Sequence, residues 1–195
     1  MSLQKLLEGN AHFVSDVFRD GSEFEYCLKG QSPHTLIIAC ADSRVPPELI
    51  FGAKPGEIFI HRNIGNMVPP GDWNLATVIE YAVNHLGVTT VAVLGHGRCG
   101  AIKALAENHG GHDAYIPGWI YHGYQAYVSL SERMPYPDNP EAQLEWLCEL
   151  EKENVRVQLK HLHTYPVISA ALAAKKISVA GLYYDMVTGT VSQIA

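Results

Sequence analysis

The chain has 195 residues, and 14 lysine and arginine residues against 20 aspartate and glutamate residues give a net charge of −6 at pH 7. This acidic balance argues against proteins that bind nucleic acid or anionic membranes, because they need a basic surface. Hydrophobic residues make up 47% of the chain and charged residues 17%, which favours a compact globular protein over a disordered one. We therefore predict a single domain over residues 1–195.

The N-terminal segment and the cysteine content bear on localisation. No apolar stretch approaches the roughly 18–20 residues that a membrane-spanning helix needs. Glu8 and Asn10 stand where a signal peptide would carry its apolar region. The four cysteines are too few for the disulfide framework of a small secreted domain. These features predict a cytoplasmic protein that does not insert into membranes.

Helical and strand patterns alternate along the chain. Apolar residues at helical spacing predict an N-terminal helix within residues 2–20. Further helices are expected at 46–51, 73–86, 100–108, 140–162 and 167–174, and strands at 35–39, 57–62, 89–94, 177–184 and 190–194. The last two strands flank a turn and predict a hairpin, residues 110–113 predict a loop, and the aromatic-rich segment 115–127 is given no element. The order predicts an α/β fold with a mainly parallel central sheet, helices on both faces and a C-terminal hairpin strand.

Three metal-binding residue types follow two of the predicted strands. Cys40 ends the first strand, and His96 and Cys99 follow the third. Because the carboxyl ends of parallel strands meet at one edge of a sheet, the three side chains can converge there. Two cysteines and one histidine suit tetrahedral Zn²⁺ and leave one position open, as catalytic zinc sites do. Buried core cysteines and a purely structural zinc are the alternatives, and the nearby Asp42 and Arg44 favour a catalytic site.

The sequence resembles the β-class carbonic anhydrases in three segments: CADSR at residues 40–44, HRNIGN at 61–66 and GHGRCG at 95–100. Weaker likeness at residues 153–155 and 183–185 extends the resemblance over nearly the whole chain. The resemblance implies that Cys40, His96 and Cys99 bind one zinc ion per chain, with Asp42 and Arg44 as a catalytic pair. It also implies a homodimer or a dimer of dimers, with active sites at the subunit interface and the helix at 1–20 packed on the partner subunit.

The resemblance further implies a substrate pocket and a proton-transfer residue. The residues that match the substrate pocket by position are Gln31, Phe59, Ile64 and Tyr81, and Gly100 is assigned to the same pocket. His85 matches a residue linked to proton transfer. On composition alone, Phe59, Ile64 and Tyr81 are better explained as core residues, and His85 as a surface or hydrogen-bonded histidine. Only the resemblance favours the pocket.

The implied activity is the reversible hydration of CO2 to bicarbonate and a proton, by attack of zinc-bound hydroxide on CO2. Two thiolates cancel the charge of Zn²⁺, so this metal should lower the pKa of its bound water less than a three-histidine site does. Activity is therefore expected to rise into alkaline pH. Asp42 can accept a hydrogen bond from the nucleophile, and Arg44 can hold the Asp42 carboxylate through two parallel hydrogen bonds. Two alternatives remain open: a zinc hydrolase acting on carbonyl sulfide or carbon disulfide, and a non-catalytic zinc scaffold of the same fold.

Overall fold

The computed structural model describes residues 1–107 and 111–195, in two compact units that comprise Met1–Gln31 and Ser32–Ala195. The predicted end of a helix at 108 and the first residue of the loop predicted at 110–113 lie outside the described residues. The single domain predicted over residues 1–195 stays a prediction, since each unit is described by itself.

The first unit consists of three short helical segments. These are α1 (Leu3–His12), the wider π-helical turn η1 (Phe13–Phe18) and the 3₁₀ helix η2 (Ser22–Lys29). The Ser2 side chain accepts a hydrogen bond from the backbone N–H of Lys5 and so caps the start of α1. The rings of Phe13, Phe18 and Phe24 pack together with centroids 5.2–6.3 Å apart. None of the residues of α1 is buried.

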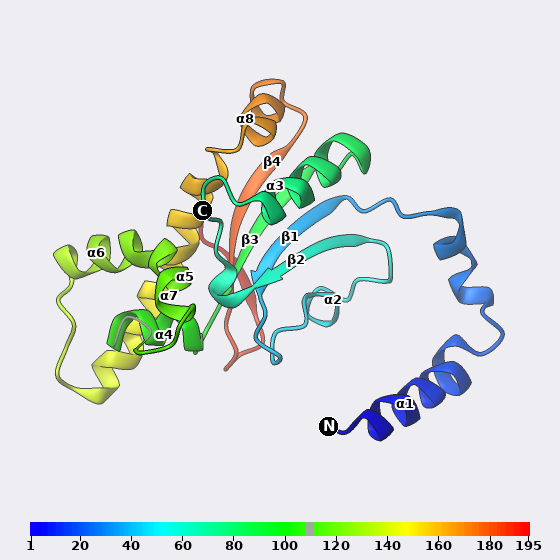
Figure 1. The fold of residues 1–195 in the computed structure, drawn as a ribbon, viewed down its shortest axis with the longest axis horizontal. Coiled ribbons are helices and arrows are strands. Elements are labelled where there is room, and N and C mark those ends of the chain that lie inside the picture. The colour runs from blue at the N-terminus through cyan, green and yellow to red at the C-terminus, as the bar shows by residue number, and fades with distance from the viewer. Residues whose placement is uncertain (108–110) are drawn as a thin grey trace. The chain divides into compact units, whose positions relative to one another are not determined.

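The second unit is built on a five-stranded sheet with the order β2-β1-β3-β4-β5 (Figure 1). Its strands are β1 (Thr35–Cys40), β2 (Ile58–Asn63), β3 (Thr90–His96), β4 (Ser178–Tyr184) and β5 (Val191–Gln193). The first four strands are parallel, and β5 pairs antiparallel with β4. The predicted α/β fold, the mainly parallel sheet and the C-terminal hairpin are confirmed.

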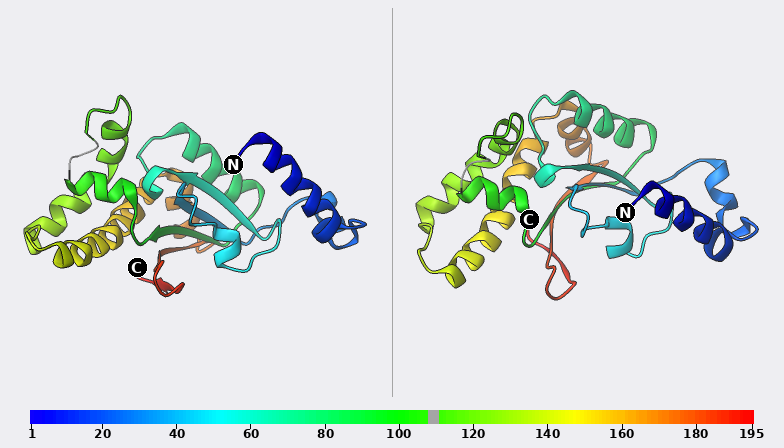
Figure 2. Two further views of the ribbon diagram at one scale, coloured as in Figure 1. Left: turned by 90° about the horizontal axis from the view of Figure 1, so that it is seen from below. Right: turned by 60° about the horizontal axis from the view of Figure 1, so that its bottom comes forward.

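Side chains of the central strand β1 point alternately to two faces of the sheet. Leu36 and Ile38 belong to a core that also contains residues of α3 (Trp73–Glu80), α7 (Pro140–Leu162) and α8 (Pro166–Ala173). Ile37 and Ala39 face the opposite core, which the short helix α2 (Pro47–Ile50) and the C-terminal hairpin cover. Figure 2 shows α3 and α8 on one side of the sheet and α2 on the other. Both faces of β1 are therefore buried.

The remaining helices are α4 (Gly100–Glu107), α5 (Ile116–Ile120), α6 (Tyr124–Arg133) and the short segments η3 (Ile64–Asn66), η4 (Tyr81–His85) and η5 (Tyr121–Gly123). The helix predicted at 140–162 is confirmed as α7. Asn139 caps its start, and Pro140 fits its first turn. The helix predicted at 73–86 is present as α3 followed by the π-helical η4. Helices α5, η5 and α6 were not predicted, since Pro117, Gly118 and the crowded aromatic residues hide a helical period.

Helix α7 lies unusually close to the sheet because β3 and β4 carry glycines where it crosses them. A Cβ on Gly95 would lie 2.4 Å from Cγ2 of Val155, and a Cβ on Gly181 would lie 2.9 Å from Cδ1 of Leu159. This approach brings the buried face of α7 next to the carboxyl end of β3. Among the described residues, no helix is long and apolar enough to cross a membrane.

Candidate metal centre

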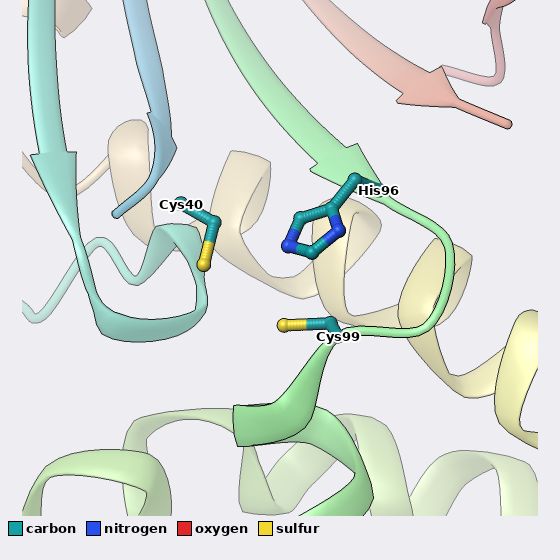
Figure 3. Close-up of side chains that lie close together, drawn as sticks. All are labelled: Cys40, His96 and Cys99. Carbon is teal, nitrogen blue, oxygen red and sulfur yellow. The ribbon is translucent and has the colours of Figure 1, made fainter. Parts of the chain in front are cut away.

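Cys40, His96 and Cys99 converge at the carboxyl edge of the sheet. Cys40 ends β1, His96 ends the neighbouring β3, and Cys99 lies in the turn that leads into α4. All three are buried, and their ligand atoms lie within 4.8 Å of one another. In Figure 3 the two thiols and the imidazole face a common point. The three side chains are therefore placed to hold a metal ion.

The hydrogen bonding of His96 leaves one ring nitrogen available. Its Nδ1 lies 2.9 Å from the carbonyl oxygen of Gly97. Because a carbonyl only accepts, Nδ1 carries the proton, and Nε2 presents a lone pair. His96 Nε2 is buried and has no hydrogen-bond partner among the described residues. A buried polar atom left unpaired costs about 1–3 kcal/mol, and a metal ion at the common point would satisfy it. The donor set and this orphaned nitrogen both fit a metal.

The two thiols differ in their surroundings. Cys40 Sγ accepts a hydrogen bond from the backbone N–H of Gly65 at 3.4 Å. A hydrogen bond from the Cys99 thiol lowers the pKa of Cys40 below its ordinary value. The same contact and burial raise the pKa of Cys99. The lowered pKa favours the thiolate form of Cys40, which is the form that binds metals. A bound dication would favour ionisation of both sulfurs.

Asp42 and Arg44 form a two-pronged ion pair in the loop after β1. Arg44 Nε donates to Asp42 Oδ1 at 2.9 Å, and Arg44 Nη2 donates to Oδ2 at 2.6 Å. The hydrogen bonds from Arg44 hold the pKa of Asp42 well below its usual range, so this carboxylate stays ionised. Arg44 Nη2 also donates to the carbonyl of Arg98, the residue before Cys99, at 3.1 Å. The pair therefore contacts the turn that carries Cys99.

Arg62 fixes the loop that contains this pair. Its Nε donates to the carbonyl of Cys40 at 2.9 Å, and its Nη2 donates to the carbonyls of Asp42 at 2.6 Å and Val45 at 2.9 Å. One guanidinium from β2 thus binds three backbone carbonyls between residues 40 and 45. The loop after β1 has little freedom to reorient as a result.

The other predicted site residues fall into separate places. Phe59, Tyr81 and His85 form an aromatic stack, with ring centroids 6.0 Å apart for the first pair and 5.4 Å apart for the second. Ile64 precedes the glycine whose N–H reaches Cys40, and Gly100 begins α4 next to Cys99. Gln31 belongs to the first unit, and its role stays a prediction.

Known proteins resemble this chain over almost its entire length. The family model described as carbonic anhydrase matches residues 35–191. A carbonic anhydrase of Synechococcus elongatus is 34% identical over 99% of this chain and 72% of that relative. One from Helicobacter pylori is 34% identical over 94% of this chain and 86% of that relative. The solved β-carbonic anhydrase CcaA aligns with a TM-score of 0.91 and 30% identity, over 99% of this chain and 95% of that one.

This chain belongs to the carbonic anhydrase family. A tetrameric β-carbonic anhydrase of Sordaria macrospora also aligns, with a TM-score of 0.89 and 30% identity over 98% of this chain and 96% of the other. Together with CcaA it assigns the chain to the β class. As a β-carbonic anhydrase, the protein is an enzyme that hydrates CO2 reversibly.

Sequence reasoning gave no role to Glu151 and Tyr183 of this carbonic anhydrase, two buried side chains beside the turn that carries Cys99. Glu151 of α7 accepts a hydrogen bond from the backbone N–H of Cys99, and Tyr183 of β4 donates to the same carboxylate. A signal was present in the sequence. Glu151 lies four residues after Leu147 and four before Val155, so a charged residue interrupts the apolar side of a predicted helix.

Proposed function

We propose that the metal of this carbonic anhydrase is zinc, one ion per chain, bound by Cys40, His96 and Cys99. Two thiolates and an imidazole are typical zinc ligands, and three protein ligands leave a fourth position for the reaction. The observation that carries this proposal is the unpartnered His96 Nε2, buried within 4.8 Å of both cysteine sulfurs. When bound, zinc would lower the pKa of a water molecule and so supply the nucleophile for CO2.

We propose that Asp42 and Arg44 orient that nucleophile. Asp42 is positioned two residues after a metal ligand, and an ionised carboxylate can accept a hydrogen bond from the attacking water. Arg44 occupies both carboxylate oxygens with parallel hydrogen bonds, which keeps the carboxylate from turning onto the metal. Lysine could not reproduce this geometry, because an ammonium group lacks the planar fork of a guanidinium.

The substrate pocket that we propose in the second unit contains Phe59, Ile64, Tyr81 and Gly100. Ile64 and Tyr81 are 48% and 45% exposed, although both carry large apolar surfaces. Such surfaces suit CO2, which is apolar and carries no charge. His85 stacks on Tyr81 and is itself exposed, so we propose that it passes protons between the site and water.

We further propose that the protein acts in the cytoplasm as a homodimer or a dimer of dimers. In the first unit, Leu3, Leu6 and Leu7 are between 55% and 72% exposed, and a partner subunit would remove this apolar surface from water. The Sordaria macrospora relative is tetrameric. The four cysteines form no disulfide, in keeping with a reducing compartment.

Metal content and CO2 hydration in matched cysteine variants test the metal site. Purified protein should contain about one zinc per chain, as a single tetrahedral site requires. Cys40→Ser should lose both metal and activity, whereas Cys27→Ser, which changes an exposed cysteine of the first unit, should keep both. Stopped-flow CO2 hydration with and without a chelator separates a zinc enzyme from a scaffold. Full zinc occupancy in Cys40→Ser would refute the ligand assignment.

A further inference from the structure

Helix α7 presents two buried polar side chains, almost one turn apart, to the metal site. Glu151 is 4% exposed and Asn154 is 0% exposed. Both contact backbone groups rather than the three proposed ligands' side chains, and neither belongs to the Asp42–Arg44 pair. Buried polar groups are retained where their hydrogen bonds are satisfied, so the partners of these two residues indicate what they hold in place.

Glu151 binds the turn that carries Cys99. The backbone N–H of Cys99 donates to Glu151 Oε1 at 2.8 Å, and the hydroxyl of Tyr183 donates to Oε2 at 2.7 Å. Both carboxylate oxygens are therefore occupied by donors, which fixes the orientation of the carboxylate. The residue before Cys99, Arg98, has a φ of 57°, a left-handed conformation that is unfavourable for a side chain larger than glycine. The bond to Glu151 helps to hold the turn in this conformation.

Asn154 binds the loop that supports Cys40. Its Nδ2 donates to the carbonyl of Gly65 at 3.2 Å, and Gln158 Nε2 donates to its Oδ1 at 2.9 Å. The second bond leaves Nδ2 as the group that faces Gly65. The N–H of Gly65 in turn donates to Cys40 Sγ at 3.4 Å. Asn154 is thus linked to Cys40 by hydrogen bonds through Gly65.

We infer that Glu151 and Asn154 are positioning residues that place both cysteine ligands from one helix. The inference rests on the proposed metal site. Helix α7 packs closely against β3 at Gly95. From this position it binds the turns at Gly65 and Cys99, which are far apart in the sequence. Residues that orient metal ligands in this way raise affinity, since the ligands need less ordering when the metal binds.

Zinc affinity, measured by competition with a chromophoric chelator, tests the inference without depending on activity. Glu151→Ala and Asn154→Ala should each weaken zinc binding by about 10–100-fold, the usual effect of removing a partner that orients a ligand. Glu151→Gln keeps an oxygen for the Cys99 N–H and should lose much less, under about 5-fold. Glu151→Asp retains the charge but is one methylene too short to reach both donors, so it should resemble Glu151→Ala.

The matched control is Glu153→Gln on the same helix. The Glu153 carboxylate is also buried, but it pairs with Arg133 and Arg156, so this variant should bind zinc as the parent protein does. Should Glu151→Ala not fold, Glu151→Asp and Asn154→Ala still decide the matter. Parental affinity in these two variants, or an equal loss in Glu151→Gln and Glu151→Asp, would overturn the inference. Absence of stoichiometric zinc from the parent protein would instead overturn the proposed metal site.

Discussion

Arg44 and Glu151 hold opposite ends of one peptide bond. The carbonyl of Arg98 accepts a hydrogen bond from Arg44 Nη2 at 3.1 Å, and the adjoining N–H of Cys99 donates to Glu151 Oε1 at 2.8 Å. The Asp42–Arg44 pair and helix α7, which we infer positions the cysteine ligands, therefore both contact the turn at Cys99. A change of Arg44 acts on Asp42 directly and on Cys99 through this peptide.

Arg44→Ala should lower kcat for CO2 hydration by at least ~10²-fold while zinc stays bound. Without the guanidinium, Asp42 is free to turn onto the metal and occupy the fourth position, which removes the nucleophile. Arg44→Lys should restore little, because lysine cannot make two parallel hydrogen bonds. The measurements are stopped-flow CO2 hydration at alkaline pH, metal content and zinc-edge spectroscopy.

Arg156→Ala is the control for removing an arginine, since Arg156 pairs with Glu153 on α7. It should leave kcat close to that of the parent protein. Near-normal kcat in Arg44→Ala with zinc retained would mean that the Asp42–Arg44 pair has only a structural role.

Gly95→Ala should destabilise the folded protein by roughly 1–3 kcal/mol, the usual cost of overfilling a packed core. The added methyl group would lie 2.4 Å from Val155 Cγ2, so α7 must move away from β3. Gly118→Ala is the matched control, because nothing lies within 4 Å of a Cβ there and alanine favours the helix by about 0.5–1 kcal/mol. Urea denaturation of both variants measures the difference. Equal stability of Gly95→Ala and the parent would contradict the close approach of α7.

The sheet could be predicted from the sequence, and so could the convergence of Cys40, His96 and Cys99 at one of its edges. Both depend on local signals. Short apolar runs gave the strands, and Cys40, His96 and Cys99 could be assigned to one edge from strand order alone. The Asp42–Arg44 pair could be predicted for the same reason, since only Ser43 separates its members. All of these relationships follow from the chain around each residue and from the parallel topology.

The contacts of Glu151 and Asn154 could not be predicted in the same way. They join α7 to turns 52 and 89 residues away in the chain, and they depend on how closely α7 packs on β3. Gly95 permits that approach, but a glycine in a strand does not indicate which helix will cross it. Helices α5 and α6 were missed for a related reason, since the packing of Ala126 and Leu130 in the core supplies stability that local propensity does not show.

Deletion of residues 1–20 should weaken self-association and lower activity together. The deleted segment carries exposed apolar side chains on α1 and η1, and an active site shared between subunits would not survive their separation. Sedimentation velocity and CO2 hydration on the same samples test this. Glu8→Gln, a change of an exposed polar residue of α1, should alter neither property. A truncated protein that is monomeric and fully active would show that activity does not depend on self-association.

Because of His61, the free energy of unfolding should decrease as the pH falls below about 6.5. Burial lowers the pKa of His61 in the folded state. Its Nε2 lies 3.3 Å from Asn63 Nδ2, and Asn63 Oδ1 accepts from the N–H of Met67, so the amide nitrogen faces an imidazole that must accept.

An unfolded histidine takes up a proton near pH 6.5, whereas the folded chain resists protonation of His61 until the pH is lower. Over that interval the unfolded state binds more protons, and the free energy of unfolding decreases with decreasing pH. His61→Gln removes the titrating group and should flatten this dependence between about pH 7 and pH 5.5. Burial also lowers the pKa of His161. Part of the pH dependence should therefore remain in His61→Gln. Urea denaturation across this range is the measurement, with His112→Gln as the control because His112 is exposed and remains hydrated when folded. A slope for His61→Gln equal to that of the parent would show that protonation of His61 does not oppose folding.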